Sequence, residues 1–434
     1  MENRKRMELE EALEMLLSEI TPVTDSETVP LPAASGRILS ETVTAKVPVP
    51  SFPKAAMDGY AVKAEETDGA SPEKPVRLTV MGESLAGKPW KGSTALLRGS
   101  TEPQKENAEK DSTGTAIEKT GASETTGTAV RIMTGAEVPR GYDAVVRQED
   151  TDYGTEAVEI YKGVTAYTNY CKVGEDIREG QDLLLAGRRI GRIEAGVLAS
   201  LGMAEVKVRR PLRITILSTG TELYEPGTPL KEGGIYSSIA YTLSASLNRA
   251  GFQVRSGICP DDTDVIADQL MQALETSDVI LTTGGVSVGV KDLLPDALER
   301  IGAKRLFSGV NVQPGTPTIG SVKNGTPILS LSGNPYAAIV NFDHYFWPLA
   351  AKLTGCEAFL PQREEAILRS EYPKTNRLRR LLRARIMNGE VTLPVKSHAS
   401  SVLSNLLECN CYIDLPAETS VAPGDRVEIL RMPE

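Results

Sequence analysis

Histidine is nearly missing from this chain of 434 residues, which contains only His344 and His398. A zinc site built from histidines needs more of them, and Ser-His-Asp chemistry needs one beside a nucleophile. We therefore expect neither kind of site. Any catalysis should rest on carboxylates, hydroxyl groups and backbone amides.

Basic residues are also too few for a general nucleic-acid binder. The 48 Lys and Arg residues against 58 Asp and Glu residues give a formal net charge of -10, and no strong basic block stands out. Binding to a phosphate backbone needs concentrated positive charge. We expect no nucleic acid among the partners.

Long apolar runs and cysteine pairs are absent from the sequence. No apolar run approaches the ~20 residues of a membrane span, and the first six residues do not resemble a signal peptide. The five cysteines form no C-x-x-C pair, and their odd number argues against a disulfide framework. The expectation is a soluble, cytoplasmic protein that does not contact a membrane.

The chain opens with a helical pattern and then turns to short extended segments. Apolar residues recur at helical spacing from Leu9 to Ile20, which predicts an amphipathic helix. Short β segments, separated by turns that contain Gly and Pro, follow up to about residue 150. Within them, residues 100–128 have Ile117 as their only large apolar side chain, so we expect a disordered surface insertion there.

Strands and helices alternate between about residues 211 and 355. The expected strands are 213–217, 252–259, 279–281 and 327–331, and the expected helices are 239–250, 264–275, 292–301 and 336–353. This order is typical of a doubly wound, mostly parallel sheet. Residues 356–434 return to β segments. The predicted fold class is therefore α/β multidomain, with β-rich domains beside the doubly wound domain.

Three of the expected strands end in loops of small and hydroxyl-bearing residues, which are Ser218–Glu222, Thr282–Gly289 and Ser332–Pro335. The ends of parallel strands meet at one edge of a sheet, where ligands bind. Amides, helix N-termini and hydroxyls in such loops suit a phosphate-like anion. No Walker motif fits, because Val290 and Lys291 follow the second loop.

Carboxylates accompany these loops at Glu222, Asp261 and Asp292. An acidic edge that faces a phosphate needs a bridging cation, and Mg²⁺ suits it. Taken singly, each acid is equally compatible with a solvated charge. Asp261 and Asp262 also precede Thr263 in the manner of a helix N-cap.

Taken together, the motifs resemble the molybdopterin molybdenumtransferase family, the molybdenum insertases (MoeA) to which the gephyrin E domain is related. The resemblance covers nearly the whole chain outside residues 100–128, and the order and spacing of its blocks are more specific than any one block. The matching blocks are Ala56–Val62, Arg131–Ala136, Pro139–Val146, Val173–Ile177, Ser218–Leu223, Thr283–Gly289 and Gly333–Pro335.

The resemblance implies an elongated subunit with four domains that pairs as a homodimer. Its domains would be residues 1–53 with 149–207, an inserted β-rich domain at 54–148, the α/β molybdopterin-binding domain at 208–355 and a C-terminal β domain at 356–434. The active site would lie on the loop edge of the α/β domain and be completed by the inserted domain of the partner subunit. The resemblance also allows a molybdoenzyme or an adenylyltransferase as a protein partner.

The implied reaction inserts molybdenum from molybdate into adenylylated molybdopterin, uses Mg²⁺ and releases AMP. The family's functional positions fall on Asp58, Thr134, Glu222, Asp261 and Asp292, of which Glu222, Asp261 and Asp292 would hold the metal. From spacing alone, Asp58 and Thr134 lie in ordinary turns. The expected contacts to the pterin nucleotide are Ser218, Thr219, Gly220, Thr283, Gly284, Gly285, Ser287, Gly289, Pro314, Gly315, Gly333, Asn334 and Pro335.

The chain also departs from the family pattern. Ser237-Ser238-Ile239 stands where Asp-Ser-Asn is usual, and Gln313 and Thr316 stand where lysines are common. Ser308 and Val290 replace a frequent basic residue and an acid. Each lost charge-assisted bond to an anion costs roughly 1.5–3 kcal/mol. Two interpretations stay open: an active insertase, or a non-catalytic or tungstate-selective paralogue that binds a nucleotide-pterin or a protein partner.

Overall fold

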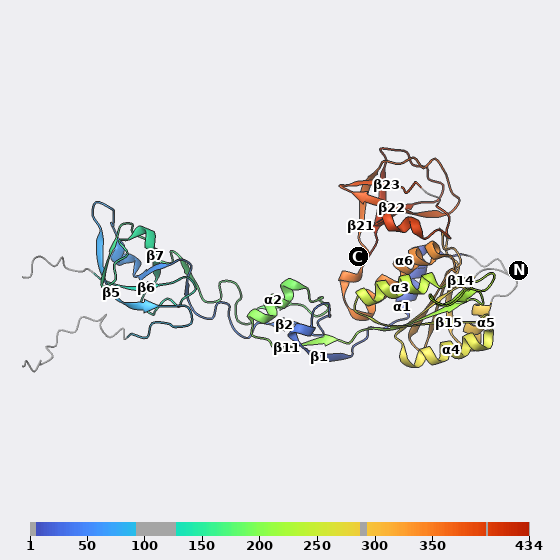
Figure 1. Ribbon diagram of the computed structural model, residues 1–434, viewed down its shortest axis with the longest axis horizontal. Helices are drawn as coiled ribbons and strands as arrows, with labels where there is room; N and C mark the ends of the chain where they lie inside the picture. The colour runs from blue at the N-terminus through green and yellow to red at the C-terminus, as the bar shows by residue number, and fades with distance from the viewer. Residues whose placement is uncertain (1–5, 93–126, 287–292, 396–397, 434) are drawn as a thin grey trace, which may run out of the picture. The chain divides into compact units, whose positions relative to one another are not determined.

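The computed structural model describes residues 6–92, 127–286, 293–395 and 398–433 (Figure 1). Contacts group the chain into two compact units: Met1–Thr42 with Leu184–Ala199 and Met203–Glu434, and Val43–Leu183 with Ser200–Gly202. This grouping does not separate four domains, so the fourfold division stays a prediction. The expected insertion lies outside the described residues, apart from Gly127 and Thr128. These two residues pair with a neighbouring strand and correct the insertion's boundary.

The first unit is built around a six-stranded sheet in the order β15-β12-β16-β20-β19-β17. Its strands are β12 (Arg213–Thr219), β15 (Gln253–Cys259), β16 (Val279–Thr283), β17 (Lys304–Ser308), β19 (Ile319–Lys323) and β20 (Thr326–Leu331). Its helices are α3 (Ser238–Arg249), α4 (Thr263–Thr276), α5 (Leu293–Arg300) and α6 (Pro335–Thr354). The predicted doubly wound domain is confirmed.

The first four strands of this sheet are parallel, as predicted, and β19 runs antiparallel to both of its neighbours, β20 and β17. The sequence pattern did not predict the strands β17 and β19. Lys304 and Arg305 make β17 look like a charged turn, and Gly320 interrupts β19. A cross-strand partner overrides such weak local signals because β preference depends on context.

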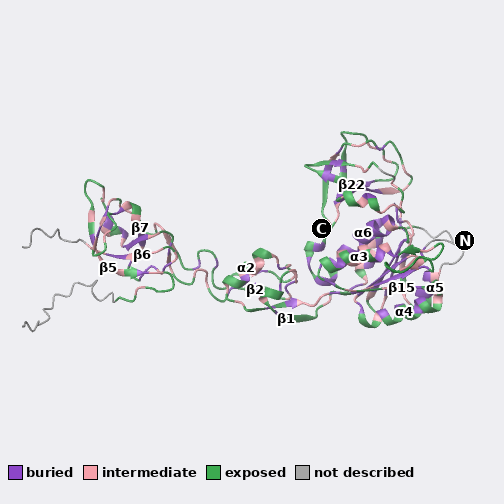
Figure 2. Ribbon diagram, viewed as in Figure 1, coloured by how far each residue is buried: buried purple, intermediate pink, exposed green. Residues whose placement is uncertain are grey.

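Helices cover both faces of the sheet, so its central strands are buried on both sides. On one face, Ile216 and Leu329 pack in a cluster with α3, α6 and the N-terminal helix α1 (Leu9–Ser18). On the other face, Leu217 and Ile280 pack with α4 and α5. Figure 2 shows the burial concentrated in α6 and the central strands. This packing makes the strand ends a rigid base for the loops that follow them.

The rest of the first unit brings together distant segments of sequence. Strand β1 (Ser26–Pro30) pairs antiparallel with β11 (Glu205–Arg209), next to α2 (Arg192–Ser200). The C-terminal strands are β21 (Arg363–Leu368), β22 (Arg379–Met387), β23 (Glu390–Thr392), β24 (Cys411–Leu415) and β25 (Arg426–Arg431), with the short helix η6 (Ser404–Glu408), and β18 (Val312–Gln313) pairs with β22 at the edge of their sheet. Because β24 also pairs with β22, five of these strands close into a ring, in keeping with the expected small β domain.

The second unit is β-rich. A five-stranded sheet has the order β7-β4-β6-β5-β8. Its strands are β4 (Gly59–Val62), β5 (Val76–Ser84), β6 (Gly127–Ile132), β7 (Ala144–Arg147) and β8 (Ala157–Ile160), and shorter pairs join β3 (Lys54–Ala55) to β9 (Tyr170–Cys171) and β2 (Val43–Thr44) to β10 (Asp182–Leu184). Buried Tyr60, Leu78 and Val146 give this sheet a core of its own.

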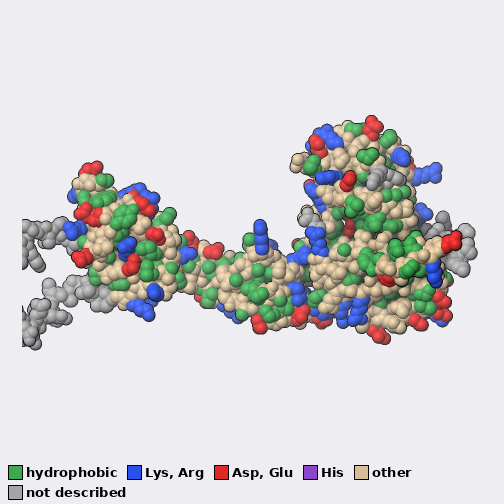
Figure 3. Space-filling model, in the orientation of Figure 1, with side chains coloured by type: hydrophobic (Ala, Val, Ile, Leu, Met, Phe, Trp, Pro, Cys, Tyr) green, Lys and Arg blue, Asp and Glu red, His purple; other side chains and the backbone are tan. Residues whose placement is uncertain are grey.

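No helix within the described ranges combines the length and the hydropathy of a membrane span. Acidic and basic side chains are interspersed on the face drawn in Figure 3.

Candidate active site

A pocket of about 790 Å³ lies in the first unit where β12, β16 and β20 end. All three loops that the sequence singled out contribute to it, within the residues that the structure describes. The lining includes these predicted contacts: Ser218, Thr219, Gly220, Thr283, Gly284, Gly285, Gly333, Asn334 and Pro335. The pocket is therefore at the carboxyl edge of the parallel strands, the position at which such sheets bind ligands.

Buried hydroxyl groups tie the strand ends together at the base of this pocket. The Thr283 hydroxyl donates to Ser218 Oγ over 3.0 Å, and the Thr219 hydroxyl donates to the Thr283 carbonyl over 3.3 Å. These three side chains are at most 4% exposed. Their mutual hydrogen bonds satisfy polar groups that would otherwise be costly to bury, and they hold the two strand ends in register.

Gly284 lets two of the loops approach each other closely. Its φ is +90°, and a Cβ at this position would lie 2.4 Å from the Thr219 carbonyl oxygen. The backbone N–H of Gly284 donates to Leu331 O over 3.1 Å, which links this loop to the end of β20 as well. Only glycine fits this conformation and this contact.

The adjacent acids Asp261 and Asp262 have different partners. Asp261 lines the pocket and accepts from the Thr221 backbone N–H over 3.1 Å, and more weakly from the Thr221 hydroxyl over 3.4 Å. Asp262 instead caps α4, because its Oδ1 accepts from the N–H groups of Asp264 and Val265. The predicted N-cap is thus Asp262 alone, and Asp261 is available to a ligand.

Glu222 is the second carboxylate in the pocket lining. Its carboxylate lies over Gly220, where a Cβ would approach both oxygens to 2.8 Å. Its backbone carbonyl accepts from Ile235 over 2.8 Å, which anchors the pair β13 (Leu223–Tyr224) and β14 (Ile235–Tyr236) beside the pocket. The two acids therefore approach the pocket from loops that follow neighbouring strands, β12 and β15.

Two helix N-termini supply the positive field of this pocket. Ser237 and Ser238 at the start of α3, and Asn334 and Pro335 at the start of α6, belong to the lining. Unpaired amides and the helix dipole favour an anion at such ends. Among the described lining residues there is no Lys, Arg or His. An anion here would meet amides and hydroxyls rather than basic side chains.

Several lining residues were not singled out from the sequence as ligand contacts. They are Leu223, Ile235, Tyr236, Val286, Leu293 and Pro317. Ile235 and Tyr236 are 52% and 44% exposed, so they offer an apolar wall. Nothing in the local pattern indicated that β14 returns to this edge. The nearest signal was the unusual run at 237–239, which directly follows it.

Some predicted contacts are not in this lining. Ser287, Gly289 and Asp292 lie outside the described residues. Pro314 and Gly315 are described but are not among the lining residues. The Gly315 carbonyl instead accepts from the Asn341 side chain over 2.7 Å and from the Thr318 hydroxyl over 2.8 Å, which ties this loop to α6.

Asp58 and Thr134 form a pair on the second unit. The Asp58 carboxylate accepts from the Thr134 N–H over 2.6 Å and from the Thr134 hydroxyl over 2.7 Å. These two donors, the N–H first, hold the pKa of the Asp58 carboxyl below its ordinary value. The resemblance named these two residues together, and the fold joins them although they are far apart in sequence.

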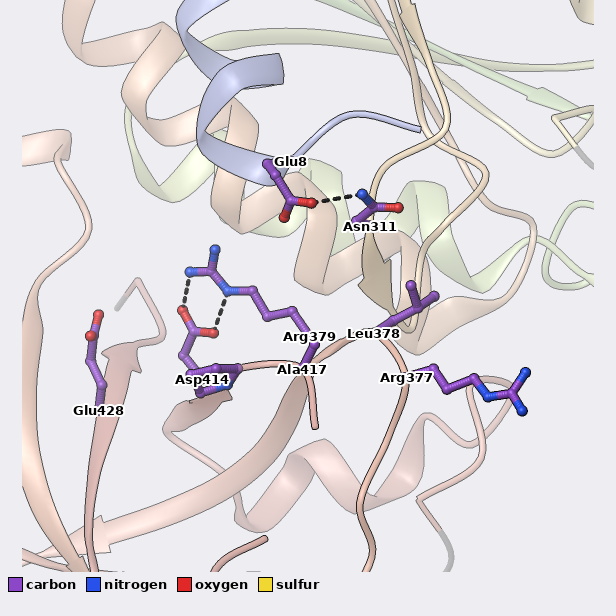
Figure 4. A pocket seen from close by; sticks show the side chains of 9 residues that line it. Glu8, Asn311, Arg377, Leu378, Arg379, Asp414, Ala417 and Glu428 are labelled. Carbon is purple, nitrogen blue, oxygen red and sulfur yellow. Dashed lines mark hydrogen bonds and ion pairs between the residues drawn. The ribbon is translucent and has the colours of Figure 1, made fainter. Parts of the chain in front are cut away.

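A second cavity of about 390 Å³ lies between α1, β22 and the C-terminal strands (Figure 4). Two of its charged residues, Arg379 and Asp414, form an ion pair with each other. Arg379 pairs with Asp414 at 2.6 Å and with Glu10 at 2.6 Å, and Glu8 accepts from Asn311. Such pairs hold the C-terminal sheet to α1, so we place the candidate active site at the strand-end pocket instead.

The donor set of the strand-end pocket is compatible with Mg²⁺. Glu222 and Asp261 offer hard carboxylate oxygens, and Mg²⁺ commonly binds one or two carboxylates together with substrate phosphates. Within the described ranges no cluster of three His, Cys, Asp or Glu side chains could hold a metal. Asp292, the third predicted ligand, is not part of those ranges.

Comparisons with known proteins agree with this architecture along the whole chain. Three family models match: the MoeA N-terminal region (domain I and II) at residues 7–202, a probable molybdopterin binding domain at 215–352 and the MoeA C-terminal region (domain IV) at 365–432.

Individual relatives match over nearly their full lengths. Molybdopterin molybdenumtransferase 2 of Mycobacterium tuberculosis is 33% identical, over 93% of this chain and 94% of the relative. Molybdopterin molybdenumtransferase of Haemophilus influenzae is 31% identical over 97% of each chain. The solved structure of the molybdopterin biosynthesis protein moeA from Pyrococcus horikoshii OT3 superposes with a TM-score of 0.78 at 27% identity, over 99% of this chain and all of that chain.

Proposed function

The chain belongs to the molybdopterin molybdenumtransferase family, and on this premise we propose that it inserts molybdenum from molybdate into adenylylated molybdopterin and releases AMP. One observation carries the proposal: three glycine- and hydroxyl-rich strand ends and two carboxylates line a single pocket in the molybdopterin-binding domain. A pocket of about 790 Å³ is within the usual size for a cofactor site.

Different residues of the pocket would bind different parts of the ligand. The N-termini of α3 and α6 and the hydroxyls of Ser218 and Thr283 would receive phosphate or molybdate oxygens. Ile235 and Tyr236 would cover a flat heterocycle, because they expose apolar surface beside the acids. The shape and polarity of the site thus suit a pterin nucleotide.

Glu222 and Asp261 would hold Mg²⁺, with Asp292 as a third ligand on the strength of the resemblance. The ion would supply positive charge next to the phosphates and the developing charge of the leaving group. The Thr221 N–H holds the Asp261 carboxylate in place through its 3.1 Å hydrogen bond. Without the ion, two carboxylates would repel an anionic ligand.

Asp58 and Thr134 are part of the proposal as residues contributed by a second copy in a homodimer. Thr134 fixes the Asp58 carboxylate through two hydrogen bonds and keeps it ionised. A carboxylate held in this way can orient a protonated or metal-bound group of the ligand. The proposed homodimer, like the proposed cytoplasmic location, rests on the resemblance.

The test is AMP release from adenylylated molybdopterin, with molybdate and Mg²⁺ added. Asp261→Asn should lower the rate by at least ~100-fold, because it removes a carboxylate from the ion and phosphate site. Asp262→Asn is the matched control, since asparagine caps a helix as well as aspartate does. Equal rates in the wild type and Asp261→Asn would contradict the role given to Asp261.

A second candidate is a tungstate-selective or non-catalytic paralogue. It is favoured by the lack of any basic side chain among the described lining residues. The same assay with tungstate in place of molybdate separates the candidates. Turnover with tungstate alone would favour the selective paralogue, and no turnover with either oxyanion would favour a binding protein.

A further inference from the structure

A third cavity, of about 550 Å³, shares no lining residue with the strand-end pocket. Its walls come from α3, α6, η6, β24 and the last described residues, Met432 and Pro433. Most of the lining is apolar, with Phe342 and Leu243 at its base and Leu407 at its rim. Its volume is typical of sites for small organic molecules, which run from about 300 to 1,000 Å³.

One carboxylate faces this apolar cavity. Among the described residues that line it, Asp343 is the only one with a formally charged side chain, and it is 6% exposed. Its Oδ2 accepts from the Tyr412 hydroxyl over 2.6 Å, and its Oδ1 accepts from Trp347 Nε1 over 3.0 Å. A carboxylate has about four acceptor positions, so two of them are free of these protein donors.

The Tyr412 and Trp347 donors use only part of the acceptor capacity of the Asp343 carboxylate. Two neighbouring buried polar side chains of α6 are neutral: Asn341 donates to Gly315 O, and His344 bonds Val340 O, with its pKa lowered to about 4 by burial. A neutral amide at 343 could accept from Tyr412 or Trp347 at a lower desolvation cost. Burial raises the pKa of Asp343 to about 6, and the described lining residues include no cation that would pair with its carboxylate.

We propose that this cavity binds an organic cation with an apolar body and one primary ammonium group, which Asp343 receives. The ammonium would complete the two unused acceptor positions in a charge-assisted bond. The apolar body would cover Phe342, Leu243 and the exposed side chain of Leu407, which is 88% exposed. Thr242, Ser246 and Ser404 add hydroxyls at the wall and rim of the cavity. The site is independent of the proposed insertase chemistry.

The test compares phenylbutylammonium with phenylbutanol, which has the same apolar body and no charge, by calorimetric titration of the full chain at about pH 8. The wild type should bind the ammonium saturably and roughly 10- to 100-fold more tightly than the alcohol, the range expected for a hydrogen bond to a charged group. Asp343→Asn should bind both probes equally. Asp268→Asn, which removes an exposed carboxylate on α4, should behave as the wild type.

A second variant keeps the test decisive if Asp343→Asn does not fold. Ser246→Phe fills the cavity from α3 and leaves Asp343 in place, so it should abolish binding of both probes. Undiminished ammonium binding in Ser246→Phe would overturn the proposal. It would also be overturned if the wild type did not distinguish the two probes, or if it bound neither because another chain covers the cavity.

Discussion

At the scale of single residues, three carboxylates lie in environments that shift their pKa values in different directions. Asp58 is exposed and held by Thr134, Asp278 is ion-paired, and Asp343 is buried against an apolar cavity. The pKa of the first two lies below the ordinary value, and that of Asp343 lies above it. The direction follows from whether donors or desolvation dominate.

Thr134→Val should raise the pKa of Asp58 toward its ordinary value. The valine removes the hydroxyl donor at 2.7 Å and keeps the backbone N–H donor at 2.6 Å, so part of the depression should remain. Carboxyl-carbon NMR titration measures the pKa directly. Thr134→Ser keeps the hydroxyl and should titrate as the wild type. Identical curves for the valine and serine variants would show that the hydroxyl does not hold the carboxylate.

Arg210→Met should destabilise the first unit by about 3 kcal/mol, the usual cost of breaking a buried ion pair. Burial alone would raise the pKa of Asp278. The two hydrogen bonds from Arg210, at 2.6 and 2.8 Å, and the Arg213 N–H lower it instead. Asp25→Asn, which alters only the exposed partner of Arg210, should cost far less. Urea unfolding at neutral pH measures both changes.

The same pair sets a pH dependence of stability. Because the pKa of Asp278 is lower in the folded state, its contribution is present above its unfolded pKa near 3.8 and is lost as the pH falls through the folded value. Unfolding free energies measured between about pH 5 and pH 2 should fall less steeply in Asp278→Asn than in the wild type. A parallel decline in both proteins would refute this assignment.

At the scale of elements, α4 begins at a defined cap. Asp262→Ala should cost about 1 kcal/mol, the typical loss for an N-cap, because the N–H groups of Asp264 and Val265 lose their acceptor. Denaturant titration measures the loss, and ligand binding at the strand-end pocket should be unchanged. Asp261→Asn should show the reverse, normal stability with weakened ligand binding. If Asp262→Ala weakened ligand binding as much as Asp261→Asn, the two acids would share one role.

At the scale of the whole molecule, the chain contains two compact units with separate cores. Leu78→Ala in the second unit and Leu329→Ala in the first should each cost about 2–5 kcal/mol, because both side chains are fully buried. Scanning calorimetry should show that each variant lowers the melting temperature of one transition. A single transition that both variants shift equally would show that the units unfold together.

Local patterns in the sequence specify the fold class, the family and most of the pocket. Strand–helix alternation and the loops at Ser218, Thr283 and Gly333 are local signals, because parallel strands that end in small residues must bring those residues to one edge. The amphipathic start at Leu9 and the long apolar helix α6 are local periodicities of the same kind.

Contacts between residues far apart in the sequence become visible only in the folded chain. In the fold, two segments with little β preference pair as β17 and β19, and the adjacent acids Asp261 and Asp262 take different hydrogen-bond partners. Ile235 and Tyr236 reach the strand-end pocket, and the buried Asp343 accepts a hydrogen bond from Tyr412. The physical reason is that cross-strand pairing, burial and desolvation depend on neighbours that are distant in sequence. No local pattern encodes those neighbours.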